Sequence, residues 1–573
     1  MGSPDVDDEE TRGAELTEPL LSTEEETTSD NNNLDNTTTT TTTTADASFF
    51  SWRHEIAEMT QLGIPLAVSF FCRMAMASMD SAFVGHLRDE KHTASTYLAA
   101  AVLSDMVTNI CVTPPLAFNQ VLNALVGQAM GSGNPKMAGI WLQQSMFWLT
   151  LSMLPCLTGL FYVEPILLKL GFPEAASELA GVYAKYNLIW PIPNGIYQCM
   201  RFYFQAQGLP RPAMYNNIFF LGVNAVLNWF FVFGGPFAWN GLGFIGAAIS
   251  LSISRTMQGV VYFCYMFLYK KHHLKTWPTA EDDEQLEEED EQGETSSSGS
   301  CCTKLLGPHH TPERTLEFLK QALPNVGTLM FSVVTSQATT ILVGRLGELS
   351  IAASSALSTV SIPWSGTLGA TLCTIASVRV GYHLGQDAPQ AAQRSSQLVL
   401  GFLTLVVGVV AIIFLLLKDW ILQVATNDEQ VLSLTSQLVV ALLVGSYLNL
   451  LVNTVTSVFS GMGRPLIATL LSFGLEMPLS IGGVAFYILK MHGNLLGVYW
   501  LGAITGGIEA VIVLWIMISS NWDHWATEAR KRQEASNPNS TTASSNSSSN
   551  SLDDNPDETA KKDDDDDAVV TFI

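Results

Sequence analysis

Asp80 is the acidic residue whose position most suggests chemistry, because it lies inside the first long apolar segment, near residues 62–84. A carboxylate within a bundle of apolar helices is costly unless it is solvated or paired, so it marks a functional site by default. Asp80 could hold a proton, a sodium ion or a cationic ligand. The alternative is a structural carboxylate satisfied by a neighbouring hydroxyl, such as that of Ser78 or Ser81.

Arg73 precedes Asp80 by seven residues, which turns an α-helix by about 700° and places both side chains on one face. The two lie about 10 Å apart along the axis, and helical side chains lean toward the helix N-terminus, so Arg73 leans away from Asp80. A direct ion pair is therefore not expected. Arg73 could line a cavity or could be a structural arginine bonded to carbonyl groups, and the structural alternative also applies to Arg255.

Four polar residues in later apolar segments are candidates for the same cavity. Asn224 and Asn228 are four residues apart and share a helix face, where they could coordinate a ligand or hold two helices together. Glu476 stands two residues before Pro478, and this proline frees a carbonyl group that makes a polar niche near the acid. Glu476 and Glu509 could each be functional or paired internally.

These residues stand out because the chain around them carries almost no charge. Of 573 residues, 47% are hydrophobic and 14% are charged, whereas a typical soluble chain has about 25% charged residues. The net charge of −25 arises in three polar strips, residues 1–50, 276–300 and 536–573, which carry −12, −10 and −7. The lack of a basic patch excludes a nucleic-acid binder. Helix-length apolar runs argue against a soluble enzyme.

Twelve apolar segments fill the chain between these strips, and each is long enough to cross a hydrocarbon core of roughly 30 Å as a helix of about 20 residues. They lack the period-two alternation of a membrane β-barrel. The predicted fold is therefore an all-α integral membrane protein with twelve transmembrane helices. We place them near residues 62–84, 98–122, 138–162, 179–204, 213–234, 243–268, 319–343, 350–378, 396–417, 430–458, 466–489 and 496–519.

Basic residues predict the orientation. Lys270, Lys271 and Lys275 follow the sixth segment, and Arg530, Lys531 and Arg532 follow the twelfth. The positive-inside rule then places both termini and the central linker in the cytoplasm. We predict a disordered acidic arm (1–52), an N-lobe of six helices (53–275), an acidic linker (276–315), a C-lobe of six helices (316–530) and a disordered acidic tail (531–573).

An internal repeat relates the two halves, and its clearest pair is FVGHL at 83–87 and LVGRL at 342–346. Two six-helix lobes of the same topology form a parallel repeat, which is typical of transporters whose substrate binds between or within the lobes. Two further spacings are repeated: Pro65–Gly85 with Pro324–Gly344, and Gly127–Gly131–Pro135 with Gly381–Gly385–Pro389.

Five short stretches occur in a recognisable order: MDSAFVGHL at 79–87, LVGQAMG at 125–131, QAQG at 205–208 with Arg211–Pro212, ASVRVG at 376–381 with Leu384–Gly385, and SSNWD at 519–523. Any one of them is a weak signal, but the resemblance covers about 55–530, the whole membrane core. The chain thereby resembles the multidrug and toxic compound extrusion (MATE) family of transporters, especially its eukaryotic branch.

The resemblance implies export of an organic, cationic solute in exchange for H⁺ or, as the less favoured ion, Na⁺. It places Asp80 at the family's first-helix acid. The chain departs from the family in its seventh helix, where Ser332 and Gln337 stand in place of two acids that eukaryotic relatives often carry. Asn449 likewise stands where an acid can occur. Either Asp80 performs the coupling, or Glu476 substitutes for the missing acids, or the coupling is unusual.

Rival classes fit the sequence less well. A membrane transferase would need a metal cluster or a buried histidine with a carboxylate partner. The sequence predicts no such cluster, so we expect no enzymatic activity, cofactor or metal. The nearest alternative is a flippase or exporter of lipid-linked or anionic organic substrates. Such proteins tend to line their cavity with cations, whereas only Arg73 and Arg255 lie near the middle of a predicted helix. We expect a monomeric, multi-pass protein of the vacuolar or plasma membrane that exports a small organic cation.

Overall fold

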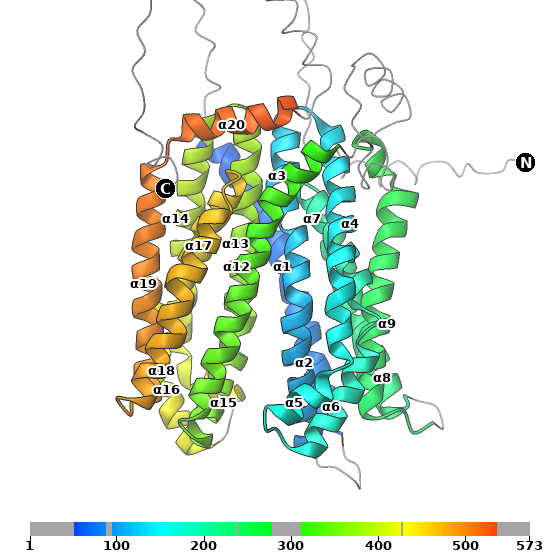
Figure 1. Cartoon of the computed structure of the whole chain (residues 1–573), viewed down its shortest axis with the longest axis vertical. Coiled ribbons are helices and arrows are strands. Elements are labelled where there is room, and N and C mark those ends of the chain that lie inside the picture. The colour runs from blue at the N-terminus through cyan, green and yellow to red at the C-terminus, as the bar shows by residue number, and fades with distance from the viewer. Residues whose placement is uncertain (1–50, 88–93, 236–238, 278–310, 426–427, 536–573) are drawn as a thin grey trace, which may run out of the picture.

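The computed structural model describes residues 51–87, 94–235, 239–277, 311–425 and 428–535. Within these ranges the chain is helical and has no strand, and long helices stand side by side with α20 (Trp522–Ala535) lying across one end of the bundle (Figure 1). We call this end the α20 end. The three acidic strips fall outside the described residues almost entirely, so the disorder predicted for the arm and the tail stays a prediction there.

The N-lobe begins with α1 and reaches η3. Pro114 and Pro115 end α2, where the chain tightens into a 3₁₀ turn before it continues as α3. Helices α4 and α7 each begin with a proline, whose fixed φ suits the first turn and whose missing N–H is not needed there. The elements are α1 (Trp52–Gly85), α2 (Ala94–Leu116), η1 (Ala117–Asn119), α3 (Val121–Gly131), α4 (Pro135–Leu160), α5 (Val163–Lys169), α6 (Glu174–Tyr186), α7 (Pro191–Ala206), α8 (Arg211–Phe233), α9 (Phe244–Phe263), η2 (Cys264–Tyr269) and η3 (His272–Lys275).

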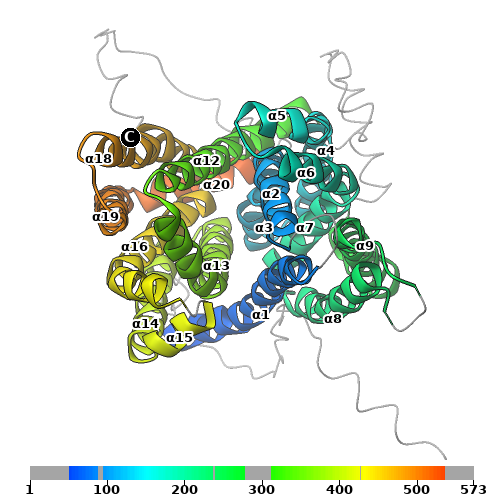
Figure 2. The same ribbon diagram turned by 90° about the horizontal axis from the view of Figure 1, so that it is seen from below.

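The C-lobe repeats this plan beside the N-lobe, as the view along the helices shows (Figure 2). Its eleventh membrane segment is irregular, because Pro478 cannot donate a helical hydrogen bond and the chain widens into π-helical turns on both sides of it. The elements are α12 (Pro312–Gly344), α13 (Glu348–Gly385), α14 (Pro389–Leu416), α15 (Lys418–Ala425), α16 (Glu429–Gly461), α17 (Leu466–Leu471), η4 (Ser472–Glu476), η5 (Pro478–Gly483), α18 (Val484–Leu489) and α19 (Leu495–Ser519).

The prediction of twelve transmembrane helices is confirmed. Nine helices of the described chain are long and apolar enough to cross a membrane, and the bent pair α4–α5 makes a tenth. The α6–α7 pair and α13 lie where the fourth and eighth segments are predicted, and they complete the twelve. Two boundaries differ by a few residues from those predicted for the C-lobe, since α12 begins at Pro312 and α20 continues to Ala535.

The two repeated glycine motifs pack against each other and join the lobes near the α20 end. Helix α3 carries Gly131 and helix α13 carries Gly385. A Cβ atom on Gly131 would overlap the carbonyl oxygen of Tyr382, and one on Gly385 would overlap that of Gln128, both well inside 3.0 Å. Small residues of this kind let two helix backbones touch, so the sequence repeat has a packing role at the seam between the lobes.

Gly131→Ala should therefore destabilise this seam. The added methyl group must displace the backbone of α13, and overpacking of this kind costs about 1–3 kcal/mol. Thermal unfolding of the purified protein measures the effect. Gly401→Ala is the matched control, because a Cβ atom there meets nothing within 4 Å and the change should be neutral or slightly stabilising. Equal unfolding temperatures for both variants would contradict the tight seam.

Candidate functional site

The carboxylate of Asp80 is 7% exposed and is held from the neighbouring helix α8. Asn224 and Asn228 each donate from Nδ2 to Oδ1 of Asp80, both at 2.8 Å. The Ser81 hydroxyl does not satisfy the acid, since it donates to the carbonyl oxygen of Ala77. Among the described residues nothing hydrogen-bonds to the second carboxylate oxygen, Oδ2. The two asparagines therefore lie on one helix face, as predicted, and together they orient the Asp80 carboxylate.

Asp105 on α2 is a second acid beside Asp80, and our sequence reasoning missed it. Asp105 is exposed, whereas Asp80 is buried. The charges of Asp80 and Asp105 act on each other and on the hydroxyl of Tyr183. Repulsion between the two carboxylates is relieved when one of them binds a proton or a cation. The criterion that singled out Asp80, an acid inside an apolar segment, would have found Asp105 as well.

Arg73 is not among the partners of Asp80, as the helix geometry predicted. The arginine whose charge acts on Asp80 is instead Arg255, on α9. A third arginine, the buried Arg201 on α7, lies near Arg73. Arg201 stands close to the end of the predicted fourth segment. For that reason the sequence analysis counted only Arg73 and Arg255 as bases near the middle of a helix.

Glu476 and Glu509 come together in the C-lobe. Glu476 ends the π-helical turn η4 and is hydrogen-bonded by Ser472, and its charge acts on Glu509 of α19, which is 7% exposed. One helical turn from each acid, Ser480 and Thr505 line a cavity of about 270 Å³. Most of its lining is hydroxyl-bearing: Thr335, Ser336, Thr339, Thr340, Ser480 and Thr505. The two acids therefore lie one turn away from a cavity whose hydroxyl groups can orient a ligand, although neither acid lines it.

The α20 end holds a buried ion cluster that the sequence analysis did not predict, and we call it the Glu55 cluster. Glu55, 2% exposed, accepts hydrogen bonds from Arg379 Nε at 3.0 Å and from the Ser395 hydroxyl at 2.9 Å. Arg379 Nη2 also binds it, and His383 Nε2 lies 3.2 Å from its Oε2. Glu55 belongs to α1, whereas the other three belong to α13 and α14. The cluster therefore joins the two lobes across the seam.

Arg532 of α20 adds a second connection at the same end. Its Nη1 donates to Gln128 Oε1 of α3 at 3.1 Å, and its Nη2 donates to the Met462 carbonyl oxygen at 3.2 Å. Gln128 in turn donates to the carbonyl oxygen of Gly461 at 2.8 Å. Helix α20 thus bridges both lobes from outside the bundle.

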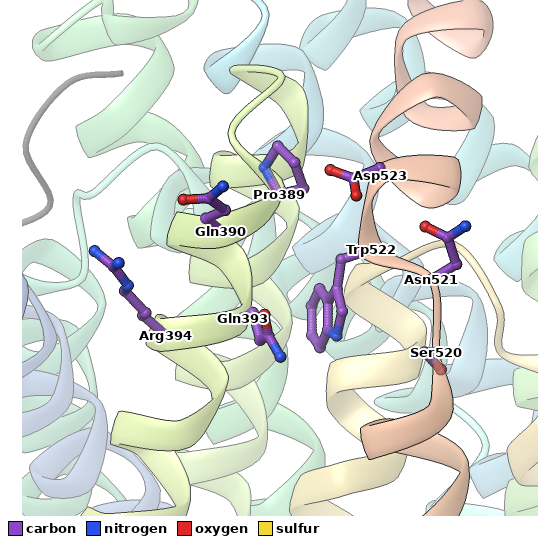
Figure 3. Close-up of a pocket in the computed structure, with 8 residues that line it drawn as sticks. All are labelled: Pro389, Gln390, Gln393, Arg394, Ser520, Asn521, Trp522 and Asp523. Atoms are coloured by element: carbon purple, nitrogen blue, oxygen red, sulfur yellow. The ribbon is translucent and has the colours of Figure 1, made fainter. Parts of the chain in front are cut away.

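A second hollow, of about 490 Å³, lies at the α20 end between the start of α14 and the turn from α19 into α20 (Figure 3). Its lining includes Gln393, Trp522 and Asp523, and Figure 3 shows the Trp522 indole beside Gln393. None of the site residues predicted from the sequence lines it. In the part of the chain that the structure describes, no group of three His, Cys, Asp or Glu side chains could hold a metal ion.

Two six-helix lobes in parallel repeat are the architecture of a membrane transporter. The chain belongs to the MatE family, whose model matches residues 65–230 and 324–481. It is 26% identical over 496 residues to protein DETOXIFICATION 16 of Arabidopsis thaliana, with 85% of this chain and 93% of the relative covered. It is 27% identical over 391 residues to multidrug and toxin extrusion protein 1 of Danio rerio, covering 68% of this chain and 60% of that protein.

The fold matches the crystal structure of a eukaryotic MATE transporter, AtDTX14, with a TM-score of 0.67 and 20% identity. That match covers 84% of this chain and 99% of the solved chain. The protein is thus a multi-pass membrane transporter of the multidrug and toxin extrusion family, whose members handle small organic substrates.

Proposed function

We propose that this protein exports organic cations in exchange for protons, by alternating access between its two lobes. The observation that carries the proposal is Asp80, a buried carboxylate with one oxygen held by two asparagines and the other without a hydrogen bond from any residue that the structure describes. Asp105 lies beside it, and the charges of the two carboxylates repel each other. Binding of one proton or one cation relieves this repulsion. Exchange requires that a bound proton and a bound cationic solute each weaken the binding of the other.

The acids of the C-lobe support a cationic cargo. Glu476 and Glu509 lie close enough for their charges to interact, and hydroxyl groups line the cavity next to them. A pair of like charges in a low-dielectric interior attracts a cation strongly. In this proposal the solute contacts these acids, while Asp80 binds the coupling proton.

The closed α20 end supports alternating access. The Glu55 cluster, Arg532 and the packed glycines hold the lobes together at one end. Breaking these contacts would let the lobes separate there, as rocking motions of repeat transporters require. We place the α20 end, both termini and the linker in the cytoplasm, because basic residues gather there. We further propose a monomer of the vacuolar or plasma membrane that has no catalytic role and no cofactor apart from the coupling ion.

Transport into proteoliposomes tests the proposal. The purified protein is reconstituted, and uptake of a fluorescent organic cation is followed under an imposed pH gradient or an imposed sodium gradient. We expect uptake to follow the pH gradient and to be accompanied by proton movement in the opposite direction. Uptake that needs sodium, or none with either gradient, would overturn the proposed coupling.

A further inference from the structure

Three arginines converge in the interior of the N-lobe. They are Arg73 on α1, Arg201 on α7 and Arg255 on α9, and the last two are 1% and 9% exposed. The charges of Arg201 and Arg255 both act on Arg73, and all three act on the hydroxyl of Tyr197. Three side chains that are far apart in sequence therefore place positive charge around one tyrosine.

Four of their nine guanidinium nitrogens are buried without a hydrogen-bond partner in the part of the chain that the structure describes. Arg73 Nη1, Arg201 Nε and Nη1, and Arg255 Nη1 are buried and have no hydrogen-bond partner among the described residues. Arg201 makes one long contact, from Nη2 to Gln198 Oε1 at 3.5 Å. Its guanidinium lies over the rings of Phe70 and Phe202, 4.7 and 4.6 Å from their centroids, and these contacts hold its plane without using its donors.

Negative charge near these arginines is insufficient. Within the described part of the chain, Asp80 acts on Arg255, and no carboxylate acts on Arg73 or Arg201. Nearby amides are neutral and supply no negative charge, and the Asn217 oxygen already accepts from Tyr197 and Gln258. A buried, uncompensated charge is strongly destabilising, and packing alone would be served better by apolar side chains. The arrangement is therefore suited to an added anion.

We propose that Arg73, Arg201 and Arg255 form a binding site for the carboxylate or phosphate group of a small organic anion. A guanidinium presents its donors in a planar fork that matches these groups and stays charged. Arg73 is only partly buried, so a ligand can approach from its side of the cluster. The inference does not rest on the proposed direction or coupling of transport, because it concerns binding at equilibrium.

The position of Asp80 gives this site a distinctive property. Its charge acts on Arg255 and opposes a bound anion, so an anion and a negatively charged Asp80 compete for the same arginine. Asp80→Asn should therefore tighten anion binding several-fold. A purely structural arginine cluster would not give an increase on removal of an acid.

Binding of four small aromatic probes to the full-length protein in phosphatidylcholine nanodiscs tests the site. Benzoate and phenyl phosphate carry the proposed group, whereas benzamide and benzylammonium share the ring but not the negative charge. We expect the two anions to bind and to raise the unfolding temperature. Arg73→Gln and Arg255→Gln should each weaken anion binding by about tenfold or more, the usual worth of a hydrogen bond to a charged group.

Controls separate loss of the site from loss of the fold. Arg211→Gln removes an exposed arginine of the same lobe and should leave binding unchanged. Arg255→Lys keeps the charge and should restore part of the affinity lost in Arg255→Gln. Equal binding of benzoate and benzamide, or unchanged anion binding in folded Arg73→Gln and Arg255→Gln, would overturn the proposal. Cation transport that fails while anion binding persists would count against the proposed function and not against this site.

Discussion

Asp80→Asn should abolish transport driven by a pH gradient, while the protein still folds and inserts. Asparagine keeps the size of the side chain and still offers an oxygen to Asn224 and Asn228, but it neither titrates nor carries charge. Removing a charge at membrane depth lowers the cost of insertion by up to about 3 kcal/mol, so loss of the protein is not expected. Proton-coupled uptake in proteoliposomes, normalised to reconstituted protein, measures the effect.

Three matched variants show whether the effect belongs to Asp80. Asp387→Asn removes an exposed acid whose partner is Arg530, and it should leave transport unchanged. Asp105→Asn should reduce the rate less than Asp80→Asn, because its carboxylate is not held by the asparagines. Glu476→Gln should also have a smaller effect. Normal pH-driven transport by Asp80→Asn, together with collapse in Glu476→Gln, would instead place the coupling in the C-lobe.

The fold was predictable because membrane helices are specified by local composition. Long apolar runs, basic flanks and a repeated spacing of glycine and proline do not depend on distant contacts, and each recurs in the structure. The spacing of the repeated glycines did not predict their packing role. That Gly131 and Gly385 pack at one seam follows only from the three-dimensional arrangement of α3 and α13.

The site was predictable only where one residue was conspicuous by itself. Asp80 stood out as an acid among apolar residues, but its partners Asn224 and Asn228 are 144 and 148 residues away, and no periodicity connects them to α1. Arg201 is a different case, because it stands near the end of the predicted segment 179–204, and only the packing of α1 and α9 around α7 shows that it is buried. Such clusters are made by packing between helices, which a linear pattern does not encode.

Glu55→Gln should weaken the closed α20 end more than any exposed substitution there. It leaves Arg379 largely buried without its main acid, at 3.8 Å from Glu58, and removing one partner of a buried ion pair costs about 3–5 kcal/mol. The exposed pair Asp387–Arg530 at the same end, 3.4 Å apart, is the control, and Asp387→Asn should cost no more than about 1 kcal/mol. Thermal unfolding of both variants gives the comparison.

A double-variant cycle then distinguishes a joint between the lobes from two separate structural residues. If Glu55 and Arg379 act as a pair, Glu55→Gln combined with Arg379→Gln should cost clearly less than the two single changes added together. Because Glu55 lies on α1 and Arg379 on α13, the coupling measured is between the lobes. Labelling of a cysteine introduced at Ser377, buried on α13 against Gly461, should also speed up in Glu55→Gln as the α20 end opens. Additive costs with unchanged labelling would mean that the cluster stabilises each lobe but does not hold the end closed.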